Sequence, residues 1–545
     1  MSAGASGTAQ AKPTRKAPKG RGLRQTMSDL HIWTGLLVGW ILYAMFLTGT
    51  VSYFRDEISR YMRPELKATA ALPPPAQAAQ TVLDAVLAQG VPLRQLSISL
   101  PTDRQPVASA FWSSPQLPGR GFDSGRFDPS SGQALQARDT QGGDFFFRFH
   151  FNFHYMSALW ARWIAGLCAM FMLVAIVSGV ITHKKIFTDF FTFRWGKGQR
   201  SWLDAHAGLS VLGLPFHFMI TWSGLVTLMV LYMPYGLQAL PSPADRQAVS
   251  AEMRFFLPAG KPAGLPAPLP LLAPMIEQAE QRWGAGGVGE VQMTHPGDAA
   301  SQVAIVRQQA QRVSTTPHYL LFDGGSGALV QVKDQAGPVA TTQGVLYGLH
   351  LGRFADVATR WLYFLVSLAG TAMVGSGLVL WTVKRRVKLP NPDKPYLGFY
   401  LVERLNIAAI AGLSVAMTAF FWFNRLLPGS VAQRSDWEIH GFFMVWAGTL
   451  AWALLRPAKR AWVELFWLAA VLLALLPLLN IWQTDRGLPA SMAAGDVLFL
   501  SVDLFLLVMA ALHAHLARRA ARRPACKTPA RNVRPPIAGP SGEAV

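Results

Sequence analysis

The hydrophobic residues of this chain fall into long runs separated by polar stretches, a pattern that indicates a membrane protein. A helix that crosses a bilayer needs about 20 consecutive, mostly apolar residues. The segments that meet this requirement are 32–54, 158–182, 203–233, 361–383, 405–423, 441–455, 462–481 and 497–516. The sequence therefore predicts a mainly α membrane protein with about eight transmembrane helices.

Two long polar segments, residues 55–149 and 234–349, lie between the first four predicted spans and are too rich in proline and glycine to cross the bilayer. In each, an amphipathic helix followed by alternating strands predicts a small α+β unit. Each unit also carries a Phe-Asp pair followed by glycine, which suits a tight turn. The predicted elements are helices 77–89 and 270–283, strands 96–100, 107–112, 289–293 and 303–307, and turns after Phe127-Asp128 and Phe322-Asp323.

Positive charge gathers on one side of the predicted spans. The net charge is +20, yet only 15% of the residues are charged, below the roughly 25% of soluble domains. With eight spans, the basic segments all fall on one side, which the positive-inside rule makes the cytoplasm. Because these charges flank apolar runs, they argue against nucleic-acid binding. The basic segments are the N-terminal arm, 184–200, 384–404, 456–460 and 518–531.

The first four predicted helices contain an internal duplication. His31 precedes Thr48-Gly49 by the same distance as His206 precedes Ser223-Gly224. Parallel repeats of this kind are related by a pseudo-twofold axis along the membrane normal. A second repeated pattern is Arg162-Trp163 before Ser178-Gly179, and Arg360-Trp361 before Ser376-Gly377.

The predicted unit is helix, outside domain, helix, and it occurs twice before a four-helix membrane region. Both termini are predicted to be cytoplasmic, in a bacterial inner membrane. The divisions are a basic arm (1–24), a helix (25–54), a periplasmic domain (55–149), a helix (150–183), a cytoplasmic loop (184–202), a helix (203–233), a periplasmic domain (234–349), a helix (350–383), a cytoplasmic loop (384–404), the four-helix region (405–516) and a basic, disordered tail (517–545).

Cysteine chemistry and signal cleavage are both disfavoured. The two cysteines, Cys168 and Cys526, are too few for a disulfide framework, a cysteine-based zinc site or an iron–sulfur cluster. The first apolar run follows a basic arm and lacks a small-residue cleavage site, so it is predicted to be an uncleaved anchor.

Histidines in and at the ends of the first four spans are the candidate functional residues. Ionisable groups at membrane depth are costly and therefore mark function by default, although each one alone could simply reach the interface. A haem iron needs neutral imidazoles, whereas zinc or di-iron sites want cysteine or carboxylates, which these helices almost lack. The candidates are His31, His150, His154, His183, His206, His217 and His350.

The duplication predicts two layers of ligands for two haem groups. His31 and His206 are equivalent and lie at the cytoplasmic face, where a pseudo-twofold axis would bring them to opposite sides of one iron. His154 and His350 form the predicted outer layer, with His150, about one turn earlier, as an alternative to His154. His217 is another alternative for the outer layer. His183 is a weaker candidate because its repeat equivalent is Trp381.

Glycines and arginines beside these histidines have two readings. The glycines leave room for a macrocycle, or serve ordinary helix packing. The arginines could bind haem propionates or an anionic substrate, or reach the interface. They are Gly35, Gly39, Gly49, Gly166, Gly179, Gly208, Gly213, Gly224, Gly370, Gly375 and Gly377, with Arg148, Arg162, Arg353 and Arg360.

Several of these motifs resemble the PepSY-associated transmembrane-helix family, over roughly residues 25–390. The two α+β units look like PepSY domains with their Phe-Asp…Gly hairpin. The other resembling motifs are Leu30-His31-Ile32-Trp33-Thr34-Gly35, Thr48-Gly49, Leu203-Asp204-Ala205-His206, Pro215-Phe216-His217, His350-Leu351-Gly352-Arg353-Phe354 and Arg360-Trp361.

The resemblance implies a haem b reductase that passes electrons outward to a periplasmic ferric siderophore. No dinucleotide fingerprint follows a strand in a cytoplasmic segment, so the electrons are expected from a separate cytoplasmic donor or from quinol. One alternative is a siderophore or iron transporter, which should show broken helices and a polar site at the midplane. Another is a non-enzymatic regulator of a periplasmic protease. The last four helices could supply a quinol site, a stabilising bundle or nothing catalytic.

Overall fold

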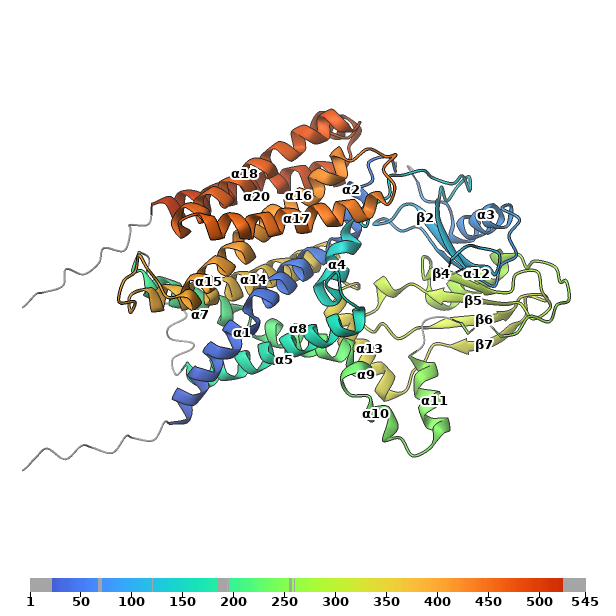
Figure 1. Cartoon of the computed structure of the whole chain (residues 1–545). Coiled ribbons are helices and arrows are strands. Elements are labelled where there is room, and N and C mark those ends of the chain that lie inside the picture. The colour runs from blue at the N-terminus through green and yellow to red at the C-terminus, as the bar shows by residue number, and fades with distance from the viewer. Residues whose placement is uncertain are drawn as a thin grey trace, which may run out of the picture.

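The computed structural model of the chain describes residues 22–66, 71–119, 121–183, 194, 196–253, 257–258 and 260–522. Most of the predicted basic arm, much of the predicted loop 184–202, the predicted tail beyond residue 522 and Cys526 lie outside these residues. In the described part of the chain, long helices make up one end of the molecule and a β-sheet the other (Figure 1).

The two repeats supply a bundle of helices that pack on one another. The first repeat contributes α1 (Leu23–Ser52), α4 (Gly143–Asn152) and α5 (Ala158–Thr182), and the second contributes α7 (Gln199–Leu212), α8 (Leu214–Thr227), α13 (Pro338–Leu351) and α14 (Val357–Arg386). Helix α1 packs against α4, α5 and α14, while α14 packs against α7, and α8 against α5 and α13. Short helices α9 (Met229–Tyr232), α10 (Tyr235–Gln238) and α11 (Pro243–Glu252) follow α8.

Seven of the described helices are long and apolar enough to cross a membrane, or eight if one bent pair counts as a single span. This confirms the predicted fold class. The predicted third span, 203–233, is the bent pair, because α7 and α8 meet at an angle of 68°. Gly213 separates them, and Pro215 stands in the first turn of α8, where a missing N–H costs least.

The two predicted α+β units share one sheet. The strands are β1 (Gln95–Ser99), β2 (Ala108–Ser113), β3 (Phe122–Phe127), β4 (Val288–Thr294), β5 (Gln302–Arg307), β6 (Tyr319–Asp323) and β7 (Leu329–Lys333), in the spatial order β3-β2-β1-β4-β5-β6-β7. At the centre β1 and β4 pair antiparallel, with Ile98 opposite Val291. The sequence predicts two separate domains, but this pairing joins them, since each half would otherwise leave an open strand edge.

One face of the sheet is the core and the other faces the helices. Helices α3 (Pro75–Leu87) and α12 (Leu272–Trp283) pack on the core face, where alternate residues such as Leu96 and Ile98 are buried. Their neighbours Ser97 and Ser99 point the opposite way. This second face carries a small apolar cluster at Ala304, Val306 and Leu321, and polar residues at Ser99, Ser109 and Glu290, where it lines a cavity above the helices.

The C-terminal module, residues 397–521, runs along one side of the bundle (Figure 1). It consists of α15 (Leu397–Ile407), a π-helical turn (Ala408–Gly412), α16 (Leu413–Leu426), α17 (Arg434–Leu455), α18 (Ala458–Gln483), α19 (Leu488–Ala494) and α20 (Val497–Ala521). Short helix α2 (Arg55–Tyr61) connects α1 to the sheet and contacts α20. The helix ends far from the sheet are basic, with Lys384, Arg385, Arg386, Arg456, Arg518 and Arg519.

Candidate functional site

Four of the predicted histidines form two facing pairs. His31 on α1 and His206 on α7 have ring centres 6.1 Å apart, and His150 on α4 and His350 on α13 have ring centres 6.2 Å apart. Each pair takes one histidine from each repeat. His150 contacts the carbonyl of Met45, which lies 14 residues after His31 on α1, a rise of about 21 Å. The pairs therefore lie near opposite ends of the bundle. His150 and His350, nearer the sheet, are the outer pair, and His31 and His206 are the inner pair.

All four histidines are held in the same way. The Nδ1 atom of each lies within 3.0 Å of a backbone carbonyl oxygen on a neighbouring helix. Since a carbonyl only accepts, Nδ1 carries the proton and donates it, which leaves the lone pair on Nε2. None of the four Nε2 atoms forms a hydrogen bond within the described residues. The accepting carbonyls are those of Ala175 for His31, Met373 for His206, Met45 for His150 and Ile220 for His350.

A glycine stands one helical turn after each accepting carbonyl, and the histidine ring packs directly on it. A Cβ atom added to Gly49 would lie 2.7 Å from Cε1 of His150, which is closer than real Cβ contacts. The corresponding distances are 2.9 Å for Gly224 to His350, 3.2 Å for Gly179 to His31 and 3.1 Å for Gly377 to His206. The Ser/Thr-Gly dipeptides of the sequence repeat therefore make room for the histidine rings themselves.

The spacing of both pairs fits two imidazoles on one metal. A metal–imidazole bond is about 2 Å long and the nitrogen lies about 1 Å from the ring centre, so opposed ligands place their ring centres about 6 Å apart. Within the part of the chain that the structure describes, no group of three or more His, Cys, Asp or Glu side chains could hold a metal ion. Each pair offers two imidazoles and no further protein ligand, which is the donor set that a haem iron needs, so the residues present fit haem.

His154 does not face His350, in contrast to the predicted outer pair. It lies in the turn after α4, between Phe153 and Tyr155, whose φ angles are 51° and 58°, and its ring stacks on Phe443 of the C-terminal module. The segment from His150 to Arg162 is two residues longer than the segment from His350 to Arg360, so the Arg-Trp pairs of the two repeats do not locate the equivalent histidine. His150, inside the helix, is the residue that the structure places opposite His350.

His217 and His183 belong to neither pair. His217, which is 1% exposed, lies in the first turn of α8 and packs against Phe46 and Gly370. Its Nε2 is 3.3 Å from the carbonyl oxygen of Val366, and its Nδ1 has no partner among the described residues. His183 follows the end of α5, and its Nδ1 likewise lacks a described partner.

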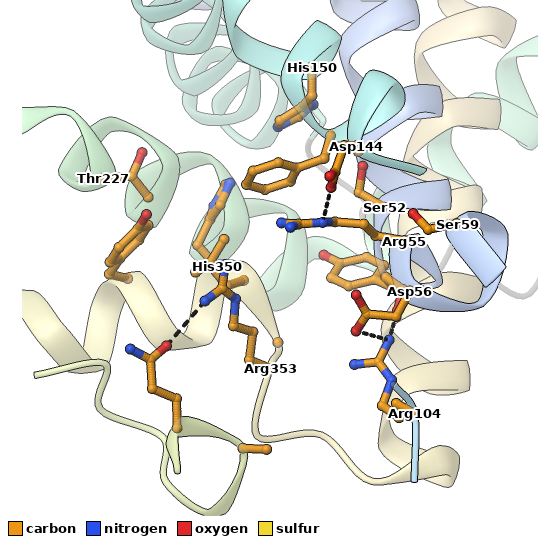
Figure 2. Close-up of a pocket in the computed structure, with 18 of the residues that line it drawn as sticks. Ser52, Arg55, Asp56, Ser59, Arg104, Asp144, His150, Thr227, His350 and Arg353 are labelled. Carbon is orange, nitrogen blue, oxygen red and sulfur yellow. Dashed lines mark hydrogen bonds and ion pairs between the residues drawn. The ribbon is translucent and has the colours of Figure 1, made fainter. Parts of the chain in front are cut away.

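A cavity of about 920 Å³ extends from His150 and His350 to the polar residues on the second face of the sheet. Figure 2 shows both histidines at the cavity, with Arg353 beside His350 and Arg55 beside Asp144. Arg55 forms an ion pair with Asp144 in the first turn of α4, and Arg353 donates to Gln309 Oε1 at 3.1 Å. The cavity thus connects the outer pair to the sheet.

The cavity lining carries more positive than negative charge. Burial lowers the pKa of the Arg353 guanidinium, and burial together with nearby Arg126 lowers that of Arg63 to about 10, so Arg63 remains protonated at neutral pH. An anion in the cavity would offset this uncompensated charge. The lining arginines are Arg55, Arg60, Arg63, Arg104, Arg126, Arg307 and Arg353, against the acids Asp56, Asp103, Asp144 and Glu290.

Only one of the four predicted anion-binding arginines lines this cavity, namely Arg353. Arg360 forms an ion pair with Glu57 at 2.8 Å, and Arg162 donates to Asn152 Oδ1. Arg148 lines a separate, shallow pocket beside His154. The sequence missed the arginines on the sheet and on α2, because only the fold brings them above the outer pair.

Substituting Gly49 with alanine is expected to weaken cofactor binding at the outer pair. Alanine is about 1 kcal/mol more favourable than glycine inside a helix, so the change should not weaken the helix itself. Any loss of cofactor must therefore come from the added Cβ atom, which displaces the ring of His150. Gly448→Ala on α17 is the matched control, since no atom lies within 4 Å of its added Cβ. Absorption spectra of the two purified variants would test this, and equal spectra would contradict it.

The comparisons with known proteins agree with the sequence motifs. The model of the family described as the PepSY-associated TM region matches residues 28–384. No curated protein matches the chain. The match covers more than half of the 545 residues and includes both histidine pairs, whereas the C-terminal module lies outside it. The chain is therefore a multi-pass membrane protein that belongs to the PepSY-associated TM family.

Proposed function

We propose that this protein binds two haem b groups and carries electrons across the membrane to an external acceptor. His31 and His206 would hold one group, and His150 and His350 the other. The observation that supports this most strongly is the two histidine pairs, spaced at 6.1 and 6.2 Å and held by the same carbonyl–glycine pattern. Haem b, when bound, supplies one-electron redox chemistry whose potential the protein tunes through its axial ligands and burial.

The residues of the chain prepare each site for that role. A carbonyl that accepts from Nδ1 fixes the tautomer and the orientation of each ring, and raises the basicity of Nε2. The glycine beneath each ring lets it approach the helix closely. Because both sites are built in this way, no group has to move or change its protonation for the ligands to be presented.

The sheet is proposed to lie in the periplasm. The described helix ends far from the sheet carry the basic residues, and the positive-inside rule places such ends in the cytoplasm. His31 and His206 then lie near the cytoplasmic face, where a separate cytoplasmic donor or quinol supplies electrons. His150 and His350 lie near the periplasmic face.

The proposed acceptor is a ferric siderophore in the cavity above His150 and His350. The cavity of about 920 Å³ opens between the helices and the sheet, and its lining has an excess of arginine. Electron transfer to a chelate that sits beside the outer pair needs proximity and matched potentials, but no general acid or base. This accounts for a site without a recognisable catalytic residue.

A transporter is the second candidate, because one observation favours it. The bend of 68° between α7 and α8, with buried His217 just beyond it, is the kind of broken helix that transporters place at the midplane. The reductase is preferred because a transporter gives no reason for two matched histidine pairs.

A reduced-minus-oxidised absorption spectrum of the purified protein, with haem extraction for quantification, separates these two functions. The reductase predicts sharp b-type bands at about two haems per chain. Cells supplied with ample haem that yield a protein without these bands would contradict the reductase and favour the transporter.

A further inference from the structure

We propose that the C-terminal module positions the axial histidine His150, so that residues on α16 and α17 determine the properties of the outer haem site. This inference rests on the proposed haem binding. It assigns a role to helices that lie outside the matched family region, since that region ends at residue 384. His150 lies on α4, a short helix.

Helix α4 cannot hold His150 in place by itself. It is only 10 residues long, and helices shorter than about 12 residues are marginal in water without tertiary contacts. It begins at Gly143 and ends at Asn152, and the flanking residues Gly142 and Phe153 have φ angles of 55° and 51°, so neither end continues into a longer helix. Its position must therefore come from the elements that pack against its sides.

Helix α4 contacts both α1 and the C-terminal module. His150 lies against α1, where it contacts Met45 and Gly49. Phe145 and Phe149 are buried against Phe442 of α17, with ring centres 5.0 and 5.9 Å apart, and Phe145 also lies 4.9 Å from Phe420 of α16. Figure 1 shows α4 between α1 and α17.

The chain just before α4 is also tied to α17. Thr140 donates through its hydroxyl to the carboxylate of Glu438 and accepts from the backbone N–H of Gly142. Glu438 is 0% exposed and forms an ion pair with Arg434, which is 2% exposed. Arg434 holds this carboxylate in place within α17, and the hydrogen bond from Thr140 to it ties the start of α4 to α17.

The second repeat supports His350 in a different way. If His150 and His350 are aligned, Asp144 and Arg148 correspond to Gly344 and Gly348. The two glycines let residues 313–316, just before β6, lie directly on α13, and a Cβ added to Gly348 would meet the carbonyl of Val313 at 1.6 Å. In the first repeat Asp144 instead forms an ion pair with Arg55 of α2, and α4 gains its contacts with the module through Phe145 and Phe149.

Phe442→Ala is the test, and Phe466→Ala is its matched control. Phe442 packs on α4, whereas Phe466, also buried on the module, packs on Trp462 and His513. Each change is made in a His206→Ala chain, which retains only the outer site, and in a His350→Ala chain, which retains only the inner site. Haem content and midpoint potential are then measured without any turnover assay.

We expect Phe442→Ala to release the outer haem or to shift its midpoint potential, and to leave the inner haem unchanged. We expect Phe466→Ala to have no such effect on the outer haem. Unchanged outer haem in Phe442→Ala would overturn the proposal. If Phe442→Ala loses both haems, the milder Phe442→Leu decides: a shift confined to the outer haem supports the proposal, and equal or absent effects overturn it. A parent chain without any haem would show instead that the proposed function has failed, and this inference with it.

Discussion

His150→Ala is expected to reduce the haem content of the purified protein from about two per chain to about one, while His154→Ala leaves it unchanged. The reason is geometric. The ring of His150 faces that of His350 at 6.2 Å, and its Nε2 is free to bind a metal. His154 lies four residues further on, outside the helix, with its ring stacked on Phe443. Haem extraction and quantification on both variants measures the difference.

The two variants control for each other, because each removes one imidazole from the same short stretch of chain. Retention of both haems in His150→Ala, with loss of one in His154→Ala, would restore the pair predicted from the sequence and contradict the structure. Loss of one haem in both would mean that the turn after α4 matters for the fold of the site.

His206→Ala is expected to abolish electron transfer across the membrane to the level of protein-free vesicles while leaving the outer haem in place. His206 pairs with His31 at 6.1 Å near the end of the bundle away from the sheet. Without that pair, a reductant on the cytoplasmic side has no partner within reach, since the outer pair lies about 21 Å further along α1. Proteoliposomes with reductant on one side and a ferric chelate on the other measure the rate.

His217→Leu provides the control for this second prediction. His217 is buried in the same bent pair of helices, but it faces neither histidine pair, and its repeat equivalent is Leu42. We expect His217→Leu to retain both haems and the transfer rate. A rate in His206→Ala that matches the unmodified protein would show that the inner pair does not carry the electrons.

The sequence was sufficient to predict the membrane spans, several strands and the equivalence of His31 and His206. Apolar run length located the spans, since the cost of burying charge in a bilayer leaves few alternatives. The predicted strands 96–100 and 303–307 match β1 and β5 to within one residue at each end. His31 and His206 could be aligned because the separation to Thr48-Gly49 and Ser223-Gly224 is the same, with no insertion between them.

What could not be predicted depends on contacts between distant segments. The pairing of β1 with β4 joins strands nearly 200 residues apart, and no local pattern encodes which strand edge meets which. The sequence pointed to His154 where the structure places His150 opposite His350. The segment from His150 to Arg162 is two residues longer than its counterpart from His350 to Arg360, and such a difference shifts the repeats relative to each other without changing the hydrophobic pattern. The bend at Gly213 arises where the His217 ring occupies the space beside a glycine.

The origin of the chain can be read from the way the pairs are assembled. Neither repeat contains a complete site, because each histidine pair takes one member from each repeat, and the central β1–β4 pairing also crosses between them. Before the duplication, a chain with one repeat could have completed both sites only as a symmetric homodimer, with identical surfaces meeting across a twofold axis. Fusion of two such chains would leave the two halves free to diverge, and the helices that contact α4 but not α13 would mark where that symmetry has been lost.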